Sequence, residues 1–213
     1  TGGRILATWQ MVTSSTSGTE GIFSAYSTTD GASYNAAAAV TDASGTDATH
    51  NMAQLALDTA NNDVWMAYSY TTTASNYDIR LKRWQAGTWQ AGTSTAAATG
   101  DMETRPGIGY VSATASLWVT WHRYALTTTA SDAQARLYYV RTTGTLPAVA
   151  FGTTYQYPTG IRTAEEHPAM VVGDGTFAYI TYLAQSDSFR GGNVYALRVP
   201  AVGGAPNTTC QLS

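Results

Sequence analysis

Charged and histidine side chains gather at a few points of the chain, next to alternating apolar runs typical of strands. Carboxylates, arginines and histidines that meet at strand ends can bind a polar ligand or carry out acid–base chemistry. The candidate ligand-binding residues are His50, Asn51, Asp101, Glu103, Arg105, His122, Arg123, Glu166 and His167. These residue types alone name no catalytic residue.

Each candidate also has a purely structural interpretation. Arg105 can form a surface ion pair with Glu103, which contributes little to stability. The three histidines lie far apart without the spacing of metal ligands, so the sequence predicts no metal site and no cofactor. The segment 58–63 lacks the glycine and the distal glutamate of a calcium loop and is predicted to be a plain turn.

The elements that must position these residues belong to an internal repeat. The pentapeptide TTTAS occurs at 71–75 and again 56 residues later, and an Arg-Leu pair follows each copy at the same offset. A glycine recurs after one strand of each unit, at Gly31, Gly87, Gly144 and Gly203. An aromatic residue closes another strand, at Trp9, Tyr68, Trp121 and Tyr182. Periods of this length are typical of repeat folds.

Each complete unit is predicted to contain four strands, which is the pattern of a β-propeller blade. The predicted strands are 51–58, 64–70, 78–84, 88–95, then 105–111, 117–123, 135–141, 148–155, then 167–173, 177–183, 193–199 and 207–213. The fold class is therefore all-β, with about four four-stranded antiparallel blades at 1–42, 43–98, 99–157 and 158–213.

The first unit is predicted to lack its innermost strand. Residues Thr1–Gly3 lead directly into the second strand, 4–9. A strand with one bare edge exposes unpaired backbone groups. We therefore expect a further segment or subunit to cover strand 4–9, and the four blades to be part of a larger, six- or seven-bladed ring.

One hairpin carries a family motif. The segment "STTDGASYN" at 27–35 resembles the Asp-box of the sialidase/BNR group, Ser-x-Asp-x-Gly-x-Thr-Trp. The matching residues are Ser27, Gly31, Ser33 and Tyr34, with Tyr in place of Trp, whereas Asp30 is displaced by one position. The corresponding turns of the next two units keep the glycine, and one keeps an aromatic residue.

This resemblance implies a sialidase-like β-propeller. It also implies that a catalytic member would have three arginines for the substrate carboxylate, a tyrosine nucleophile with a glutamate, and an aspartic acid as the proton donor. Only Arg105 stands where that arginine triad requires one, and its expected equivalents in the ring are Asn51 and His167. Neither the triad nor the Tyr/Glu pair can be recovered, so the sequence disfavours sialidase activity.

In a propeller the loops sort onto two faces, and one set is longer here. The longer loops are 10–20, 41–50, 71–77, 96–104, 124–134, 156–166 and 184–192. All the candidate ligand residues fall at or beside this long-loop face, together with tyrosines suited to stacking on sugars.

Composition excludes several classes. Charged residues make up 12% of the chain and the net charge is −3, so no basic stripe for nucleic acid is present. No apolar run is long enough to span a membrane as a helix. We expect a secreted or cell-surface binding module that recognises a glycan or an extracellular protein through the long-loop face. The alternatives are a sialidase-like glycoside hydrolase, with a carboxylate pair such as Asp101 and Glu166, and an architectural subunit of a larger extracellular assembly.

Overall fold

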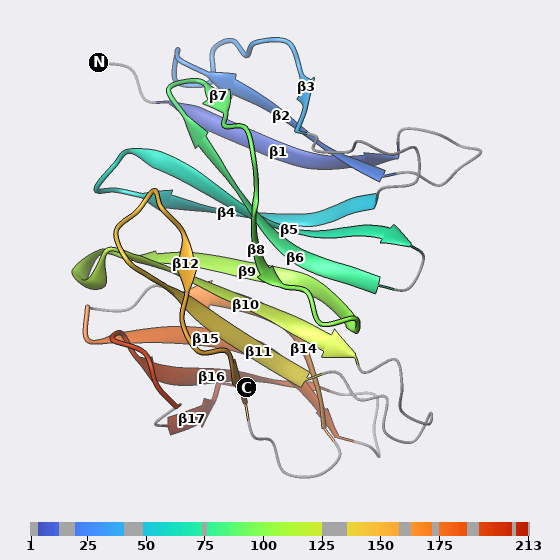
Figure 1. The fold of residues 1–213 in the computed structure, drawn as a ribbon, viewed down its shortest axis with the longest axis vertical. Helices are drawn as coiled ribbons and strands as arrows, with labels where there is room; N and C mark the ends of the chain where they lie inside the picture. Colours follow the sequence, from blue (N-terminus) through green and yellow to red (C-terminus); the bar gives the residue numbers. More distant parts are fainter. Residues whose placement is uncertain are drawn as a thin grey trace.

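The protein is an all-β chain, as the sequence predicts (Figure 1). A computed structural model describes residues 4–12, 20–40, 49–73, 76–124, 136–157, 163–171, 175–186, 192–205 and 208–212. Within these residues the chain forms seventeen strands and one short 3-10 helix, Ser112–Thr114. Short strands separated by Gly, Asn, Asp and Ser turns explain this content, because long alternating runs have no helical period.

The strands form three sheets, of three, ten and four strands. The ten-stranded sheet consists of two antiparallel groups joined by one parallel pair, Tyr77 with Met102. The chain therefore has four antiparallel groups in sequence order. The first group contains β1 (Ile5–Val12), β2 (Glu20–Ser27) and β3 (Ala38–Ala39). The second contains β4 (Thr49–Asp58), β5 (Asp63–Thr73), β6 (Asn76–Gln85), β7 (Thr88–Trp89) and β8 (Ser94–Ala97). The third contains β9 (Met102–Val111), β10 (Ser116–Tyr124), β11 (Arg136–Thr143), β12 (Ala150–Phe151) and β13 (Tyr155–Gln156). The fourth contains β14 (Thr163–Val171), β15 (Phe177–Ser186), β16 (Gly192–Pro200) and β17 (Thr208–Gln211).

The predicted strands agree with this order, and the outer strands differ in detail. The outer strand of the second group, predicted at 88–95, is interrupted and becomes β7 and β8, and that of the third group becomes β12 and β13. Gly92 in the first interruption has φ of +82°, a conformation that glycine adopts at little cost. The interrupted stretches line pockets between the groups.

The groups stack face to face along the length of the molecule (Figure 1). Apolar side chains fill each interface, including Ile22 with Met66 between the first two groups. Ala67 packs with Val119 between the second and third groups, and Trp118 packs with Ile180 between the third and fourth. The second strands β5 and β10 are buried on both faces, because each is covered by a group on either side.

The inner strands β4, β9 and β14 share one irregularity. In each of them, two residues oppose a single residue of the neighbouring second strand, which is a β-bulge. The residues opposite the bulges are Tyr68, Trp121 and Tyr182, the aromatic markers of the sequence repeat. The repeat in sequence therefore corresponds to a repeat in strand pairing.

The bulges correct one expected alignment. They align Asn51 with Thr104 and Glu166, and they align Met52 with Arg105 and His167. The prediction that Asn51 shares a ring with Arg105 and His167 is thus wrong by one residue. A bulge consumes an extra residue, and no local pattern in the sequence fixes which residue that is.

The hairpin that resembles an Asp-box is held by hydroxyl groups. Ser27 Oγ accepts hydrogen bonds from the backbone N–H groups of Gly31 at 2.9 Å and Thr29 at 3.1 Å. Thr29 Oγ1 accepts one from the N–H of Ser33 at 3.0 Å. Gly31 has φ of +86°, a conformation that glycine adopts at little cost. Asp30 is exposed at the tip.

The segment 58–63 is a tight turn, as predicted. Asp58 Oδ1 accepts hydrogen bonds from the backbone N–H groups of Ala60 and Asn61 at 3.0 and 3.2 Å. Its other carboxylate oxygen accepts one from Asn61 Nδ2 at 2.7 Å. Asp58 therefore acts as the acceptor that closes the β4–β5 hairpin.

Candidate functional site

The predicted ligand residues lie at one end of the strands. His50 and Asn51 lie at the start of β4. Asp101 directly precedes β9, and Glu103 and Arg105 lie in its first residues. His122 and Arg123 lie at the end of β10, just before Tyr124. Glu166 and His167 lie in β14. Antiparallel pairing places the start of an inner strand beside the end of a second strand, so all nine positions share this end of the fold.

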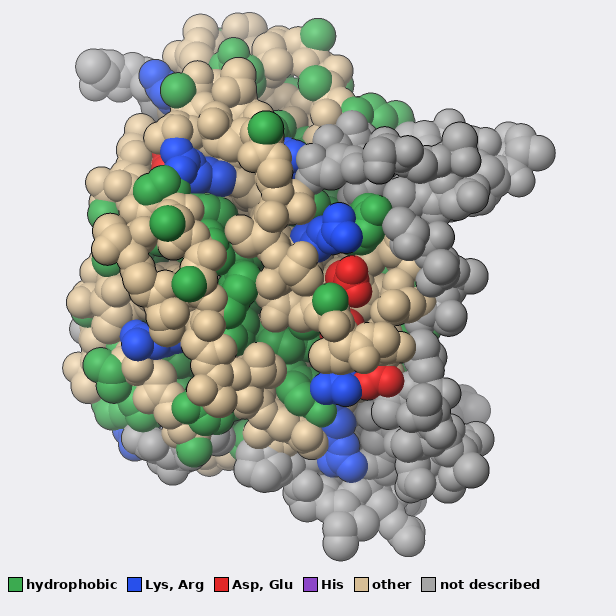
Figure 2. Space-filling view, viewed as in Figure 1, with side chains coloured by type: hydrophobic (Ala, Val, Ile, Leu, Met, Phe, Trp, Pro, Cys, Tyr) green, Lys and Arg blue, Asp and Glu red, His purple; other side chains and the backbone are tan. Residues whose placement is uncertain are grey.

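Three of the predicted residues meet in the third group. Arg123 donates from Nε to Asp101 Oδ2 at 2.6 Å, and Arg123 is directly opposite Glu103 in the strand pairing. Glu103 is fully buried, and Thr99 Oγ1 donates a hydrogen bond to its Oε1. Its Oε2 has no hydrogen-bond partner among the described residues. In Figure 2, acidic and basic side chains lie close together on the right of the view, and further basic side chains lie on the left.

Burial raises the pKa of Glu103 above its ordinary value of 4.5, although Thr99 and the nearby Arg123 act in the opposite direction. The same cause, removal from water, raises the pKa of Asp78, which forms an ion pair with Arg80 at 3.7 Å. Two carboxyl groups near this end of the fold are thus displaced toward the neutral form. Such groups can serve as proton donors in catalysis, and they also occur in purely structural clusters.

Glu103→Gln is expected to make the protein more stable near neutral pH. The folded-state pKa of Glu103 lies above its unfolded value, so its contribution is most favourable below pH 4.5 and is lost as pH rises through the folded pKa. Each unit of such a shift costs about 1.4 kcal/mol. Glutamine keeps an oxygen for Thr99 and carries no charge. Thermal unfolding of both proteins from pH 4 to pH 8 measures this, and a variant that is less stable at pH 8 contradicts it.

Two of the predicted residues do not face solvent as expected. His122 is fully buried, and the strand pairing places it on the side of the third group that faces the fourth. Arg105 is half-buried, and it occupies the bulge of β9 with φ of +53°. Stacking of the groups therefore covers His122, and its role in ligand binding stays a prediction.

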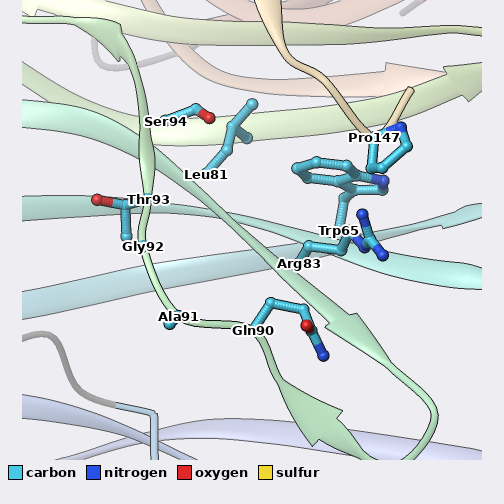
Figure 3. A pocket seen from close by; sticks show the side chains of 9 residues that line it. All are labelled: Trp65, Leu81, Arg83, Gln90, Ala91, Gly92, Thr93, Ser94 and Pro147. Atoms are coloured by element: carbon cyan, nitrogen blue, oxygen red, sulfur yellow. The ribbon is translucent and has the colours of Figure 1, made fainter. Parts of the chain in front are cut away.

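A pocket that the sequence did not indicate lies between the second and third groups. It has a volume of about 220 Å³, and it is lined by Trp65, Leu81, Arg83, Gln90, Ala91, Gly92, Thr93, Ser94 and Pro147. Its wall includes the stretch between β7 and β8. Figure 3 shows the indole of Trp65 beside Pro147, with Arg83 and Gln90 on one side of it.

The polar groups of this pocket are held by the surrounding strands. Arg83 Nε lies 3.1 Å from Asp63 Oδ2, and Asp63 is buried at the start of β5. Burial raises the pKa of Asp63 above its ordinary 3.8, despite the opposing effect of Arg83. Trp65 Nε1 is buried and has no hydrogen-bond partner among the described residues.

A second pocket of about 350 Å³ lies between the third and fourth groups. It is lined by Trp118, Tyr139, Arg141, Thr143, Gly152, Thr153, Tyr155, Val202, Gly203 and Gly204. Arg141 Nη1 donates to the carbonyl of Ala201 at 3.2 Å. Trp118 Nε1, like Trp65 Nε1, is buried without a hydrogen-bond partner in the described part of the chain.

The two pockets occupy equivalent places in the repeat. Trp65 is directly opposite Arg83 in the β5–β6 pairing, and Trp118 is directly opposite Arg141 in the β10–β11 pairing. In the first group the corresponding pair is Leu6 and Tyr26. Tyr26 packs on Trp84 of the second group with ring centroids 5.8 Å apart, so a tyrosine stands where the later groups have an arginine. Each pocket thus contains a Trp/Arg pair at the same position of the repeat.

The sequence contains a signal for these pockets. Arg83 and Arg141 are 58 residues apart, and each lies a few residues before a glycine marker. The tryptophans Trp65 and Trp118 also recur at nearly the repeat length. Their meaning depends on pairing across strands and on contact between groups, which the repeat length alone does not reveal.

The described residues offer neither a candidate metal site nor a helix that could span a membrane. No group of three or more His, Cys, Asp or Glu side chains there is placed to hold a metal ion. None of the helical structure in that part of the chain is long and apolar enough to cross a membrane.

Comparison with known proteins shows the fold alone. No family model matches the chain, and no curated protein matches it. Among solved structures, the chain is similar to the Hadza microbial sialidase Hz136, with a TM-score of 0.63 and 10% sequence identity. The match covers 90% of this chain and 40% of the sialidase chain. The chain therefore has a sialidase-like all-β fold, and it spans well under half the length of that structure.

Proposed function

We propose that the chain is a secreted or cell-surface binding module that recognises glycans, and that its four groups are blades of a β-propeller. The observation that carries the proposal is the pair of equivalent pockets between successive groups. A site that recurs with the repeat gives a binding module more than one copy of the same contact, which raises avidity.

The chemistry of both pockets suits a sugar ring. Sugar hydroxyls need several donors and acceptors, and the first pocket offers a guanidinium, the amide of Gln90 and the hydroxyls of Thr93 and Ser94. Trp65, Leu81 and Pro147 offer apolar surface for the ring carbons. The volumes lie near or below the lower end for small-molecule sites, which favours one or two sugar units.

This proposal moves the binding site away from the long-loop end. There, Arg123 is engaged by Asp101, and Glu103 is fully buried. Arg83 and Arg141 are also engaged, by Asp63 and by the carbonyl of Ala201. The two pockets differ from that end in their open volume, which further polar side chains line. The favoured site therefore differs from the one that loop length predicts.

A glycan array followed by isothermal titration tests the proposal. The chain is expected to bind a saccharide with a stoichiometry near two. Arg141→Ala removes the charged donor of one pocket, which weakens that site roughly 10- to 100-fold, by the usual contribution of a hydrogen bond to a charged group. The stoichiometry should then fall to one. Gln90→Ala should weaken the other pocket, and it leaves the buried Arg83–Asp63 pair intact.

Arg136→Ala is the matched control, because Arg136 lies on the same strand as Arg141 at the long-loop end. It should leave both the affinity and the stoichiometry unchanged. If Arg136→Ala abolishes binding while Arg141→Ala and Gln90→Ala do not, the ligand binds at the long-loop end and the proposed site is wrong.

A second candidate function is glycoside hydrolysis of the sialidase-like type. The observation that favours it is the pair of carboxyls, Glu103 and Asp78, whose pKa values burial raises at the end where the sequence predicted the ligand. Release of a fluorescent aglycone from sialosides and other aryl glycosides tests it. Turnover that Glu103→Gln removes would favour the hydrolase, and no turnover across the panel would reject it.

A further inference from the structure

One face of the first group is apolar and open. The strand pairing places Ile5, Trp9 and Met11 of β1 on the side of this group that faces away from the second group. Their exposed fractions are 40%, 37% and 43%, and Trp9 stacks on Phe23 with ring centroids 6.4 Å apart. Tyr34, which follows the hairpin of the first group, is 49% exposed.

The same position is buried in every other group. Trp9 corresponds in the repeat to the aromatic residues opposite the bulges, Tyr68, Trp121 and Tyr182, which are 1%, 2% and 3% exposed. Each of the three packs against the group that precedes it. The first group has the residues for such an interface, and no preceding group covers it within the described residues.

Tyr34, in the loop between β2 and β3, also indicates that this face of the first group is uncovered. The backbone N–H groups of Asn35, Gln90 and Gly152 make equivalent bonds to the third strands of their groups, so Tyr34, Trp89 and Phe151 correspond. Trp89 donates from Nε1 to Ser24 Oγ of the first group at 2.9 Å, and Phe151 packs against the core between the second and third groups. Tyr34 has no equivalent group to pack against in the described part of the chain.

The fourth group presents the complementary face. The β15–β16 pairing places Phe177, Tyr179, Leu183 and Val194 on the side directed away from the third group. Val194 is 37% exposed. In the second and third groups this side holds Trp65 and Trp118, which pack on the following group. Within the described residues, the first and fourth groups thus present two apolar faces of opposite type, which the repeat elsewhere packs against each other.

We propose that, in the isolated chain, the open face of the first group binds the open face of the fourth group of a second copy. The contact would reproduce the interface that the repeat already forms three times within one chain. Such a head-to-tail contact is heterologous, so it leaves one open face at each end and can close into a ring or continue as a chain of copies. Burial of apolar side chains on both faces supplies the driving force.

Two single substitutions and their mixture test the proposal by sedimentation velocity. Trp9→Arg blocks the face of the first group, and Val194→Arg blocks the face of the fourth. The wild-type chain should sediment as dimers and larger species as its concentration rises, and each variant alone should remain a monomer. An equimolar mixture of the two should form a 1:1 dimer and nothing larger, because each variant retains one intact face. Circular dichroism verifies that both variants are folded, and Met11→Arg replaces Trp9→Arg if that variant unfolds.

Two outcomes overturn the proposal. A wild-type chain that stays monomeric at every concentration shows that these faces do not bind each other. Self-association of Val194→Arg alone shows that the first-group face pairs with itself, in a two-fold symmetric contact.

Discussion

Trp121→Ala is expected to lower the free energy of unfolding by about 3–5 kcal/mol, the usual cost of emptying a buried tryptophan site. Trp121 is 2% exposed, stacks on Tyr138 with ring centroids 5.9 Å apart, and packs in the core between the second and third groups. The second group and the bulge of β9 both cover Trp121. Because the surrounding side chains are closely packed, they cannot easily fill the cavity that the indole would leave. Equilibrium unfolding in urea measures the loss.

Trp9→Ala is the matched control, because Trp9 occupies the same place in the repeat without a preceding group over it. Trp9→Ala should lower the free energy of unfolding by less than half as much as Trp121→Ala does. Both variants are measured at concentrations where the chain is monomeric. Equal losses would mean that the first group is covered as fully as the third, and the assignment of an open face would be wrong.

Arg83→Ala is expected to destabilise the protein by about 3–5 kcal/mol, because removing one partner of a buried ion pair leaves the other charge uncompensated. Asp63 is 1% exposed, and Arg83 Nε lies 3.1 Å from its carboxylate. Burial already raises the pKa of Asp63 above 3.8, and without Arg83 it would rise further. The folded state then binds more protons than the unfolded state above pH 3.8, so the stability of the variant should fall as pH rises from about 4.

The double variant Arg83→Ala with Asp63→Asn should recover most of this loss near neutral pH, since asparagine is neutral in both states. Urea unfolding of the wild type, the two single variants and the double variant gives the coupling free energy. A double variant as unstable as the sum of the two single variants would show that the charges are not coupled, and Arg83 would then act through packing alone.

Much of the fold could be predicted because the features that repeat are visible in short segments of the sequence. The alternating runs located the inner three strands of each complete group, and the glycines at 31, 87, 144 and 203 all have positive φ, as their place in turns requires. The aromatic markers proved to be the residues opposite the bulges. In each case a single segment carries the information, through its alternation or its need for a residue without a side chain.

The parts that could not be predicted depend on contacts between segments. The alignment of Asn51 with Thr104 follows from a bulge, which local sequence does not locate. The burial of His122 follows from the fourth group stacking on the third. The pockets require Trp65 and Arg83, eighteen positions apart, to face each other while Pro147 of the next group lies beside them. The length of the loops predicted a binding site at the long-loop end. The two pockets instead lie between successive groups, where the packing of one group on the next forms them.

A crystal structure of the chain with the saccharide selected by the array tests the central claim most directly. The account predicts one sugar beside Trp65, Arg83 and Gln90, and an equivalent one beside Trp118 and Arg141, each between two successive groups. A sugar bound beside Asp101 and Arg123 at the long-loop end, with both pockets empty, would contradict the account.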